Sequence, residues 1–445
     1  MRDMTMKPLT MTVASAMLAC VGTGIAQAGS NPVPRWTMQV HAEEGYDDFK
    51  VTDLNNSGQM TGHTSITAQP WSLQFGFITD GMSNSIFNTG EAQYYGQVIN
   101  EAGVAAGYSN GSDQLVRFEL VDGVPIVTEL AFLNSGSFTP KNLKINEAGM
   151  ITGRVPQGAG VFQAFQWTPD TGMQEIMTGS SVNVMDMNEA GAVVGQSSKG
   201  AFYYLDGDLE MLPGSAALSI DEAGRVLLRT GYETAAFSMY DLSTGEQEAI
   251  ISGLPLSWAG TIGYADESGR VVITWMVDDQ AHMATWSSEH GLNIAELPDS
   301  WIACTNVLMN EAGEAIVGVL DEEYITRYFF SRGLHNNGGF TDITKRVFDF
   351  CGEYIYSVVG FNDAGQIAMQ LRIELNLEHT AILSMARQGD TNGDGTVGVN
   401  DLLAVIGNWG EWIAEDDCGG TILPDLDGDG QVNVTDLLIC IGDWD

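Results

Sequence analysis

The chain has 445 residues, and its 58 acidic and 18 basic residues give a formal net charge of −40 at pH 7. This charge repels phosphate backbones and anionic lipids, so nucleic acid and anionic membrane surfaces are excluded as main partners. It suits a salty or calcium-containing medium, in which screening and bound cations offset the self-repulsion.

Residues 1–28 are predicted to be a secretory signal. Basic residues precede an apolar run over residues 11–25, and Ala26-Gln27-Ala28 fits a cleavage site of small residues. A lipoprotein signal with its cysteine at Cys20 is the alternative. No later stretch approaches the roughly 18 apolar residues of a membrane span. We therefore expect a secreted or cell-surface protein without an anchor of its own.

A four-residue turn of the type Asn-Glu-Ala-Gly recurs through residues 29–388. Asn or Asp at its first position is expected to cap the turn, and glycine at its fourth position supplies the left-handed conformation. Each turn therefore joins two strands of a hairpin. The repeated glutamate is interpreted as a turn residue that points to solvent. The eight glycines, on average about 44 residues apart, are Gly58, Gly103, Gly149, Gly191, Gly224, Gly269, Gly313 and Gly365.

A second element follows each glycine after 11 to 17 residues. Alternating bulky residues, as in Ala164-Phe165-Gln166-Trp167, predict a strand with one buried face. A further strand follows after a glycine-containing turn, so each repeat holds about four short strands and no convincing helix. The bulky position of this element is occupied by Phe75, Phe118, Phe165, Phe202, Phe237, Thr285, Tyr328 and Ile382.

Four strands in each period predict a mainly β fold, a propeller of about eight four-stranded blades, with seven blades as the alternative. The repeats resemble the HAF repeat of secreted bacterial proteins, although its histidine is absent here. This resemblance implies a structural motif without enzymatic residues. Because an open sheet edge invites aggregation, we expect the ring to close. Trp36–His41 and residues 49–54 would join two strands from residues 365–385 in one blade.

The sequence contains no motif for a serine nucleophile, a phosphate loop or a dinucleotide site. Carboxylates are too abundant for their spacing to identify a glycosidase pair. Trp71, Trp258 and Trp301 lie outside the repeated aromatic strand, so they either stack on sugar rings or pack within blades. Beyond the signal, the cysteines either form one disulfide within each part of the chain or remain free thiols; they are Cys304 and Cys351, and Cys418 and Cys440.

Two stretches near the C-terminus, residues 390–401 and 425–436, place oxygen-bearing side chains at positions 1, 3, 5 and 12 and glycine at position 6. This spacing wraps a loop around a hard cation, and we predict two Ca²⁺ ions, because Mg²⁺ prefers a tight octahedron and keeps its waters. The valines at position 8 are expected to bridge the two loops. The predicted ligands are Asp390, Asn392, Asp394, the Thr396 carbonyl and Asp401, and Asp425, Asp427, Asp429, the Gln431 carbonyl and Asp436.

One loop followed by one helix, in duplicate, resembles a type I dockerin over residues 389–445, with helices over residues 401–406 and 436–441. A helix-loop-helix EF-hand would need a further helix before each loop. The resemblance implies calcium-dependent binding to a cohesin domain. Positions 10 and 11 hold Val399-Asn400 and Val434-Thr435 instead of the Ser-Thr pair common in cellulosomal dockerins.

These features favour a secreted, non-catalytic recognition or cell-surface protein. Its propeller would bind an extracellular polysaccharide or a protein, and its tail would dock to a cohesin-type scaffold. A polysaccharide-degrading hydrolase or lyase with its site on the propeller face is one alternative, and a structural envelope or matrix protein is another. Without metal the tail is expected to be poorly ordered, because its carboxylates repel one another.

Overall fold

The computed structural model describes residues 35–444 except 42–45, 47, 69–70, 80–83, 88–92, 111, 113, 131–138, 232–233, 256–261, 267, 296, 324, 334–338, 344–346, 348–353, 375–376, 412–422 and 428–429. The predicted signal therefore lies outside the described residues. No helix in the described part is long and apolar enough to cross a membrane. These residues form two compact units, one of residues 35–386 and one that starts at residue 387.

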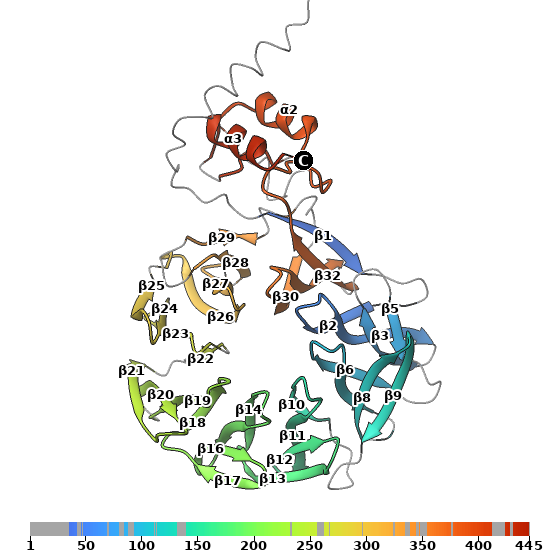
Figure 1. Ribbon diagram of the computed structural model, residues 1–445, viewed down its shortest axis with the longest axis vertical. Coiled ribbons are helices and arrows are strands. Elements are labelled where there is room, and N and C mark those ends of the chain that lie inside the picture. Colours follow the sequence, from blue (N-terminus) through green and yellow to red (C-terminus); the bar gives the residue numbers. More distant parts are fainter. Residues whose placement is uncertain are drawn as a thin grey trace, which may run out of the picture. The chain divides into compact units, whose positions relative to one another are not determined.

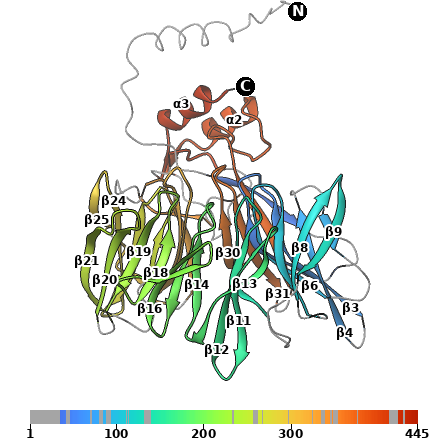
Figure 2. The same ribbon diagram turned by 60° about the horizontal axis from the view of Figure 1, so that its bottom comes forward.

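The first unit is a propeller of eight four-stranded blades, so the mainly β fold and the count of eight are confirmed. Figure 1 shows the blades in chain order around the ring, with the first strand of each blade nearest the centre. In Figure 2 the strands of neighbouring blades run between the two faces of the ring. All pairings within the blades are antiparallel, as expected for strands joined by short turns.

The strands of the first four blades are β2 (Asp48–Leu54), β3 (Met60–Ala68), β4 (Trp71–Thr79) and β5 (Asn84–Phe87); β6 (Tyr94–Ile99), β7 (Ala105–Ser109), β8 (Gln114–Val121) and β9 (Val124–Leu130); β10 (Lys141–Ile145), β11 (Ile151–Gly158), β12 (Val161–Thr168) and β13 (Gly172–Ser180); and β14 (Asn183–Met187), β15 (Val193–Ser197), β16 (Gly200–Leu205) and β17 (Asp208–Met211).

The strands of the last four blades are β18 (Ala216–Ile220), β19 (Arg225–Thr230), β20 (Thr234–Asp241) and β21 (Gln247–Pro255); β22 (Ile262–Ala265), β23 (Val271–Val277), β24 (Gln280–Ser287) and β25 (Gly291–Ala295); β26 (Trp301–Met309), β27 (Ala315–Asp321), β28 (Thr326–Ser331) and β29 (Thr341–Asp342); and β30 (Tyr354–Phe361), β31 (Ile367–Glu374), β32 (Leu377–Met385) and β1 (Trp36–His41).

Each repeated turn joins two strands of a hairpin, as predicted, and these are the first and second strands of its blade. The turn glycines have φ between 73° and 80°, which is the left-handed region that glycine enters without strain. In all eight turns the side chain of the first residue accepts the N–H four residues later, at 2.7–3.0 Å. The capping role of this Asn or Asp is therefore confirmed.

The same asparagines also link the blades to one another. In six turns the side-chain Nδ2 donates to the carbonyl of the first residue in the next turn, as from Asn55 to Asn100 at 2.9 Å. The bond from Asn362 to Asn55, at 3.0 Å, connects the last blade to the first. A side chain that closes a turn and bridges to the neighbouring blade explains why this position repeats around the ring.

The repeated glutamates are exposed turn residues, as predicted, but they also have a role that was not predicted. The side chains are exposed, but their carboxylates accept backbone N–H groups from the preceding turn. Glu101 accepts from Asn56 at 2.8 Å, and Glu147 accepts from Glu101 at 2.7 Å. Adjacent turns lie close together at the inner rim, so a side chain of this length reaches the neighbour. The glutamates thus add a second set of bonds between blades.

The apolar cores lie between neighbouring blades. The bulky position of each third strand is at most 5% exposed in all eight blades, which confirms the strand with one buried face. Phe118 of β8, for example, packs with Ile78 and Phe87 of the preceding blade. Because blades share these cores, each one depends on both of its neighbours.

The ring closes through a terminal strand, but not with the predicted composition. Trp36–His41 pairs with β32 as the outermost strand of the last blade, as expected. Asp48–Leu54 instead forms the innermost strand of the first blade, and β30, β31 and β32 supply three strands to the last one. The physical reason is the position of the repeated turn, which joins the first and second strands of one blade. The strand just before a turn is therefore the first strand of the same blade as the strand after the turn.

The second unit contains two helices, α2 (Val399–Gly407) and α3 (Val434–Gly442), and the short strands β33 (Gly410–Glu411) and β34 (Gln431–Val432). The predicted helices over 401–406 and 436–441 lie within α2 and α3. Val397 and Val432 are both fully buried in one apolar cluster. This shared cluster agrees with the predicted apolar bridge between the two loops, while the backbone of Val432 pairs with Gly410.

Candidate metal centre in the C-terminal unit

The second loop gathers three carboxylates. Asp425, Asp427 and Asp436 are buried, and each offers an oxygen within 4.8 Å of the others. Gly430, with φ of +82°, donates its N–H to Oδ2 of Asp425 at 3.3 Å, so the glycine turns the loop back onto its first residue. Converging anionic oxygens of this kind suit a hard cation. The remaining predicted carboxylate, Asp429, lies outside the described residues.

The carboxylate at position 12 of each loop also caps the helix that follows it. Asp436 accepts the N–H of Leu426 on Oδ1 at 2.6 Å and the N–H of Asn433 on Oδ2 at 2.8 Å. Asp401 makes the equivalent bonds 35 residues earlier, at 2.8 and 2.9 Å. A carboxylate offers about four lone pairs, so these bonds leave capacity for a metal. One side chain therefore closes the loop, caps the helix and can ligate an ion.

The first loop is arranged more loosely. Asp390 is buried and its Oδ2 accepts the N–H of Gly395 at 2.9 Å. Asn392 donates from Nδ2 to Asp394 at 3.1 Å, so these two predicted ligands contact each other. Hydrogen bonds from the Thr396 hydroxyl and N–H, then from Asn392, lower the pKa of Asp394. Among the described residues, only the second loop shows three carboxylates gathered at one point.

The buried carboxylates of this unit have no basic residue nearby in the sequence to balance them. No Lys, Arg or His follows Arg387, and Arg387 donates to the carbonyl oxygen of Asp443 at 2.6 Å. Burying carboxylates without a compensating positive charge is costly. The five aspartates of the loops that are at most 9% exposed are Asp390, Asp401, Asp425, Asp427 and Asp436.

The two helices and the residues just after their ends carry the same exposed apolar side chains at a spacing of 35 residues. These residues are 39–60% exposed, although apolar groups of this size normally lie inside a folded unit. Such a duplicated apolar surface is typical of an interaction site. The four pairs are Val399 and Val434, Leu403 and Leu438, Ile406 and Ile441, and Trp409 and Trp444.

No protein-family model matches the sequence, and no curated protein matches it. Among solved structures, Sqt1 from Chaetomium thermophilum matches at 10% identity and a TM-score of 0.47, over 80% of this chain and 99% of that chain. A streptogramin B lyase matches at 10% identity and a TM-score of 0.37, over 79% and 98% of the two chains. These values assign no family and no activity to this chain.

Other residues singled out in the sequence do not form a site in the described part of the chain. Trp301 is 3% exposed and packs against Phe329 and Phe340, with ring centroids 4.6 and 4.8 Å away, so its role is blade packing and not sugar stacking. Cys304 is a free buried thiol, and burial raises its pKa to about 12. Trp258, Cys351 and Cys418 lie outside the described residues.

Sequence reasoning missed three contributors to the loops. Thr391, at position 2, donates its hydroxyl to Asp401 at 2.9 Å. Asp443 accepts the N–H of Gly389 at 3.0 Å and thereby ties the end of α3 to the start of the first loop. Asn433 caps α3 through a bond from Thr435 and donates to the Gln431 carbonyl at 3.3 Å. A comparison of the two loops at the 35-residue offset gives no signal for these positions, because their counterparts are Leu426, Asn408 and Gly398.

Proposed function

We propose that the C-terminal unit binds two Ca²⁺ ions and is a dockerin-like module. The observation that carries this proposal is the set of five buried loop aspartates in a segment without a single basic residue after Arg387. Oxygen ligands at these positions suit Ca²⁺ better than Mg²⁺. Each bound ion would neutralise carboxylates that otherwise repel one another, so its binding energy stabilises the folded unit.

The module docks to a cohesin-type domain through the apolar helix faces. This assignment is supported by the duplicated row of exposed residues that runs along α2 from Val399 to Trp409 just beyond its end, and along α3 from Val434 to Trp444 just beyond its end. Calcium would hold each helix in place, because Asp401 and Asp436 belong both to a loop and to the first turn of a helix. Docking would therefore depend on calcium.

The propeller serves recognition and not catalysis, and a predicted secretory signal places the protein outside the cell or on its surface. The carboxylates of the inner turns support a scaffold role, since Glu101, Glu147 and Glu189 are engaged as acceptors of backbone N–H groups from neighbouring blades. The ligand would be an extracellular polysaccharide or a protein. Release of new reducing ends from a polysaccharide would instead favour the hydrolase or lyase alternative.

Calorimetric titration of the full chain with Ca²⁺ tests the metal site. We expect two ions per chain, and each site should raise the unfolding free energy by about 2.7 kcal/mol when free calcium is a hundred times its dissociation constant. Asp436→Asn should weaken one site at least about ten-fold, because the amide removes a charge from the ligand set. Asp170→Asn, an equal change on the exposed surface of the propeller, is the matched control. A full chain that takes up no calcium would contradict the proposal.

A second experiment tests docking separately from metal binding. Leu403→Asp combined with Leu438→Asp introduces charge into both apolar rows while leaving every predicted ligand in place. We expect this variant to bind calcium normally and to lose capture by an immobilised cohesin-type domain. Unchanged capture would show that these helix faces are not the docking surface, whereas lost calcium binding would point to a disturbed fold.

A further inference from the structure

A small pocket lies in the seventh blade, at the turn between β27 and β28. It encloses about 240 Å³, more than the roughly 150 Å³ of an engineered cavity that accommodates benzene. Its walls combine the aromatic rings of Trp301 and Phe329 with four charged side chains from the turn region, Asp321, Glu322, Glu323 and Arg327. The pocket belongs to the propeller and is independent of the calcium loops.

One carboxylate of the pocket is used to build the turn. Asp321 accepts the N–H groups of Glu323 and Ile325 on Oδ1, at 3.0 and 2.9 Å, and the Arg327 Nε on Oδ2, at 2.7 Å. Desolvation raises the pKa of Asp321, but the bonds from Arg327, Ile325 and Glu323 together hold it below its ordinary value. Asp321 is therefore charged and accepts three donors, and it fixes the position of the arginine.

Arg327 is likewise committed within the pocket. Its Nη2 lies 3.7 Å from Oε2 of Glu323, and its Nε donates to Oδ2 of Asp321. The hydrogen bond to Asp321 raises the pKa of Arg327, so the guanidinium stays charged. Two carboxylates already neutralise this one cation, which argues against a pocket for phosphate or carboxylate ligands.

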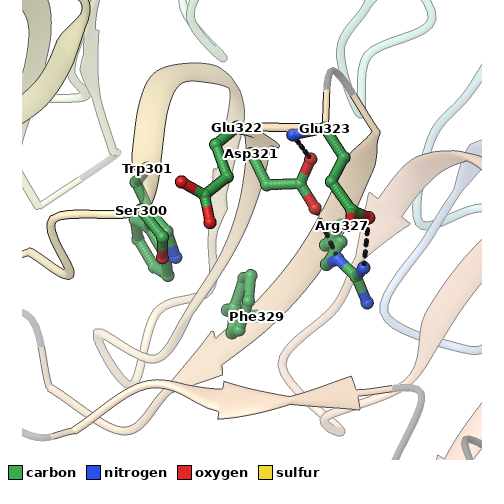
Figure 3. Close-up of a pocket in the computed structure, with 7 residues that line it drawn as sticks. All are labelled: Ser300, Trp301, Asp321, Glu322, Glu323, Arg327 and Phe329. Carbon is green, nitrogen blue, oxygen red and sulfur yellow. Dashed lines mark hydrogen bonds and ion pairs between the residues drawn. The ribbon is translucent and has the colours of Figure 1, made fainter.

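Glu322 differs from its neighbours. Its side chain makes no hydrogen bond or ion pair with any residue in the described part of the chain, and Figure 3 shows its carboxylate on the side of Ser300 and Trp301, across the pocket from Arg327. The four charged residues that line the pocket have a net charge of −2. A further acidic residue, Asp299, precedes Ser300 in the adjoining loop. A cation is thus favoured at the open side of the pocket.

The aromatic wall distinguishes an organic cation from a metal ion. Trp301 and Phe329 offer no oxygen ligands, and among the described residues the carboxylates of this pocket do not bring three oxygens together as the second loop does, so the pocket is a poor site for Ca²⁺. An alkyl chain, in contrast, would cover the part of the Phe329 ring that is open to water while an ammonium group bonds to Glu322. Because the Trp301 ring is almost fully buried, its face is not free to stack on a sugar.

We propose that this pocket binds a primary ammonium group on an apolar stem, with Glu322 as the ion-pair partner and Phe329 against the stem. The group would come from a free diamine or from a lysine side chain of another protein. In either case binding should weaken as salt is added, because the pair is partly exposed to solvent.

Calorimetric titration of the full chain with 1,5-diaminopentane, and separately with N-acetyl-lysine methylamide, tests the proposal and distinguishes the two sources. Saturating Ca²⁺ is included so that the carboxylates of the C-terminal loops are occupied. We expect millimolar binding of at least one amine, and no binding of pentan-1-ol, which has a similar stem without charge. Equal binding of the alcohol, or no binding of either amine, would overturn the assignment.

Glu322→Gln is the decisive variant, because this exposed side chain carries no contact that folding needs. It should weaken amine binding about three- to five-fold, the range expected for a partly exposed ion pair. Glu210→Gln removes an exposed charge on another blade and should leave binding unchanged. If both variants bind the amine as tightly as the natural chain, the ammonium does not lie at Glu322 and the proposal fails.

Discussion

At Asp53, in the innermost strand of the first blade, desolvation raises the pKa of the carboxyl to about 6. The N–H groups of Ile99 and Leu54, at 2.9 and 3.0 Å, and the charge of Lys144 lower it without cancelling the desolvation. The Asp53 carboxylate accepts its hydrogen bond from Ile99 in the next blade. The same carboxyl group, which is costly to ionise, therefore also joins two blades. Asp186 has the same arrangement, with a bond to Ile220 at 3.1 Å and a raised pKa.

The raised pKa of Asp53 predicts a pH dependence of stability. Between about pH 4 and 6 the folded state holds a proton that the unfolded state has lost, so the contribution of this group to stability falls as the pH rises. At pH 7.5 Asp53→Asn should therefore be more stable than the natural chain by about 1–2 kcal/mol, after a discount for partial exposure. Urea unfolding at pH 5 and 7.5 measures the difference.

The comparison between the two pH values isolates this carboxyl, since other groups titrate equally in both proteins. The advantage of Asp53→Asn should shrink or reverse at pH 5, where the natural carboxyl is largely protonated. An advantage of the same size at both pH values would mean that the substitution acts through packing or hydrogen bonding alone.

At the scale of the repeated turn, two blades show how the chain compensates for a changed residue. Six turns begin with Asn, whose amide donates to the next turn, whereas two begin with Asp221 and Asp266, which have no N–H to donate. In both of these, an arginine four residues later pairs with the aspartate, as Arg270 does at 2.6 Å. The same arginine then donates to the next turn, at 3.1 Å for Arg270 and Asn310.

This compensation predicts a rescue experiment. Arg270→Met should cost about 2–3 kcal/mol of unfolding free energy, because the nearly buried Asp266 loses its charge partner and the bond to Asn310 disappears. Adding Asp266→Asn should recover a large part of the loss, since an asparagine restores the arrangement of the other six turns. A double-mutant cycle in urea measures the coupling.

The alternative outcome is equally clear. If the double variant is as unstable as Arg270→Met, then the arginine stabilises the blade through its own packing and not by replacing an asparagine.

At the scale of the whole propeller, closure depends on the few residues of β1. Trp36 is fully buried, lies 5.3 Å from Phe330 between ring centroids, and belongs to the core shared by the last two blades. A short N-terminal strand thus completes a blade whose other strands are more than 300 residues away in the sequence. Once it pairs with β32, the sheet edge at this point is covered.

We predict that Trp36→Ala destabilises the propeller by about 3–5 kcal/mol, the usual cost of removing a large buried aromatic side chain. Trp36→Phe should cost far less, because the ring is retained and the buried indole Nε1 has no hydrogen-bond partner to lose. Trp409→Ala, at a residue that is 54% exposed, is the surface control. Denaturant unfolding of the four proteins provides the measurement, and equal stabilities of Trp36→Ala and Trp409→Ala would contradict a closing role for β1.

Local chemistry explains which predictions succeeded. The turn glycines need a positive φ, and the alternating residues around Phe165 need one buried face, so these features can be recognised from single segments. The hydrogen bond between Glu101 and the preceding turn could not be recognised in this way, because the two turns are 45 residues apart and meet only when blades pack side by side. The assignment of Asp48–Leu54 failed for a related reason: the pattern shows a strand but not the blade it enters.

The sequence by itself determined the repeated four-stranded unit, the number of blades and the two loops with their oxygen spacing, because each depends on contacts within a few tens of residues. Only the tertiary structure decided how the ring closes, how glutamates and arginines bridge neighbouring turns, and which loop aspartates are buried together. Those features arise between segments far apart in the chain, where the partner is set by packing and not by local conformational preference.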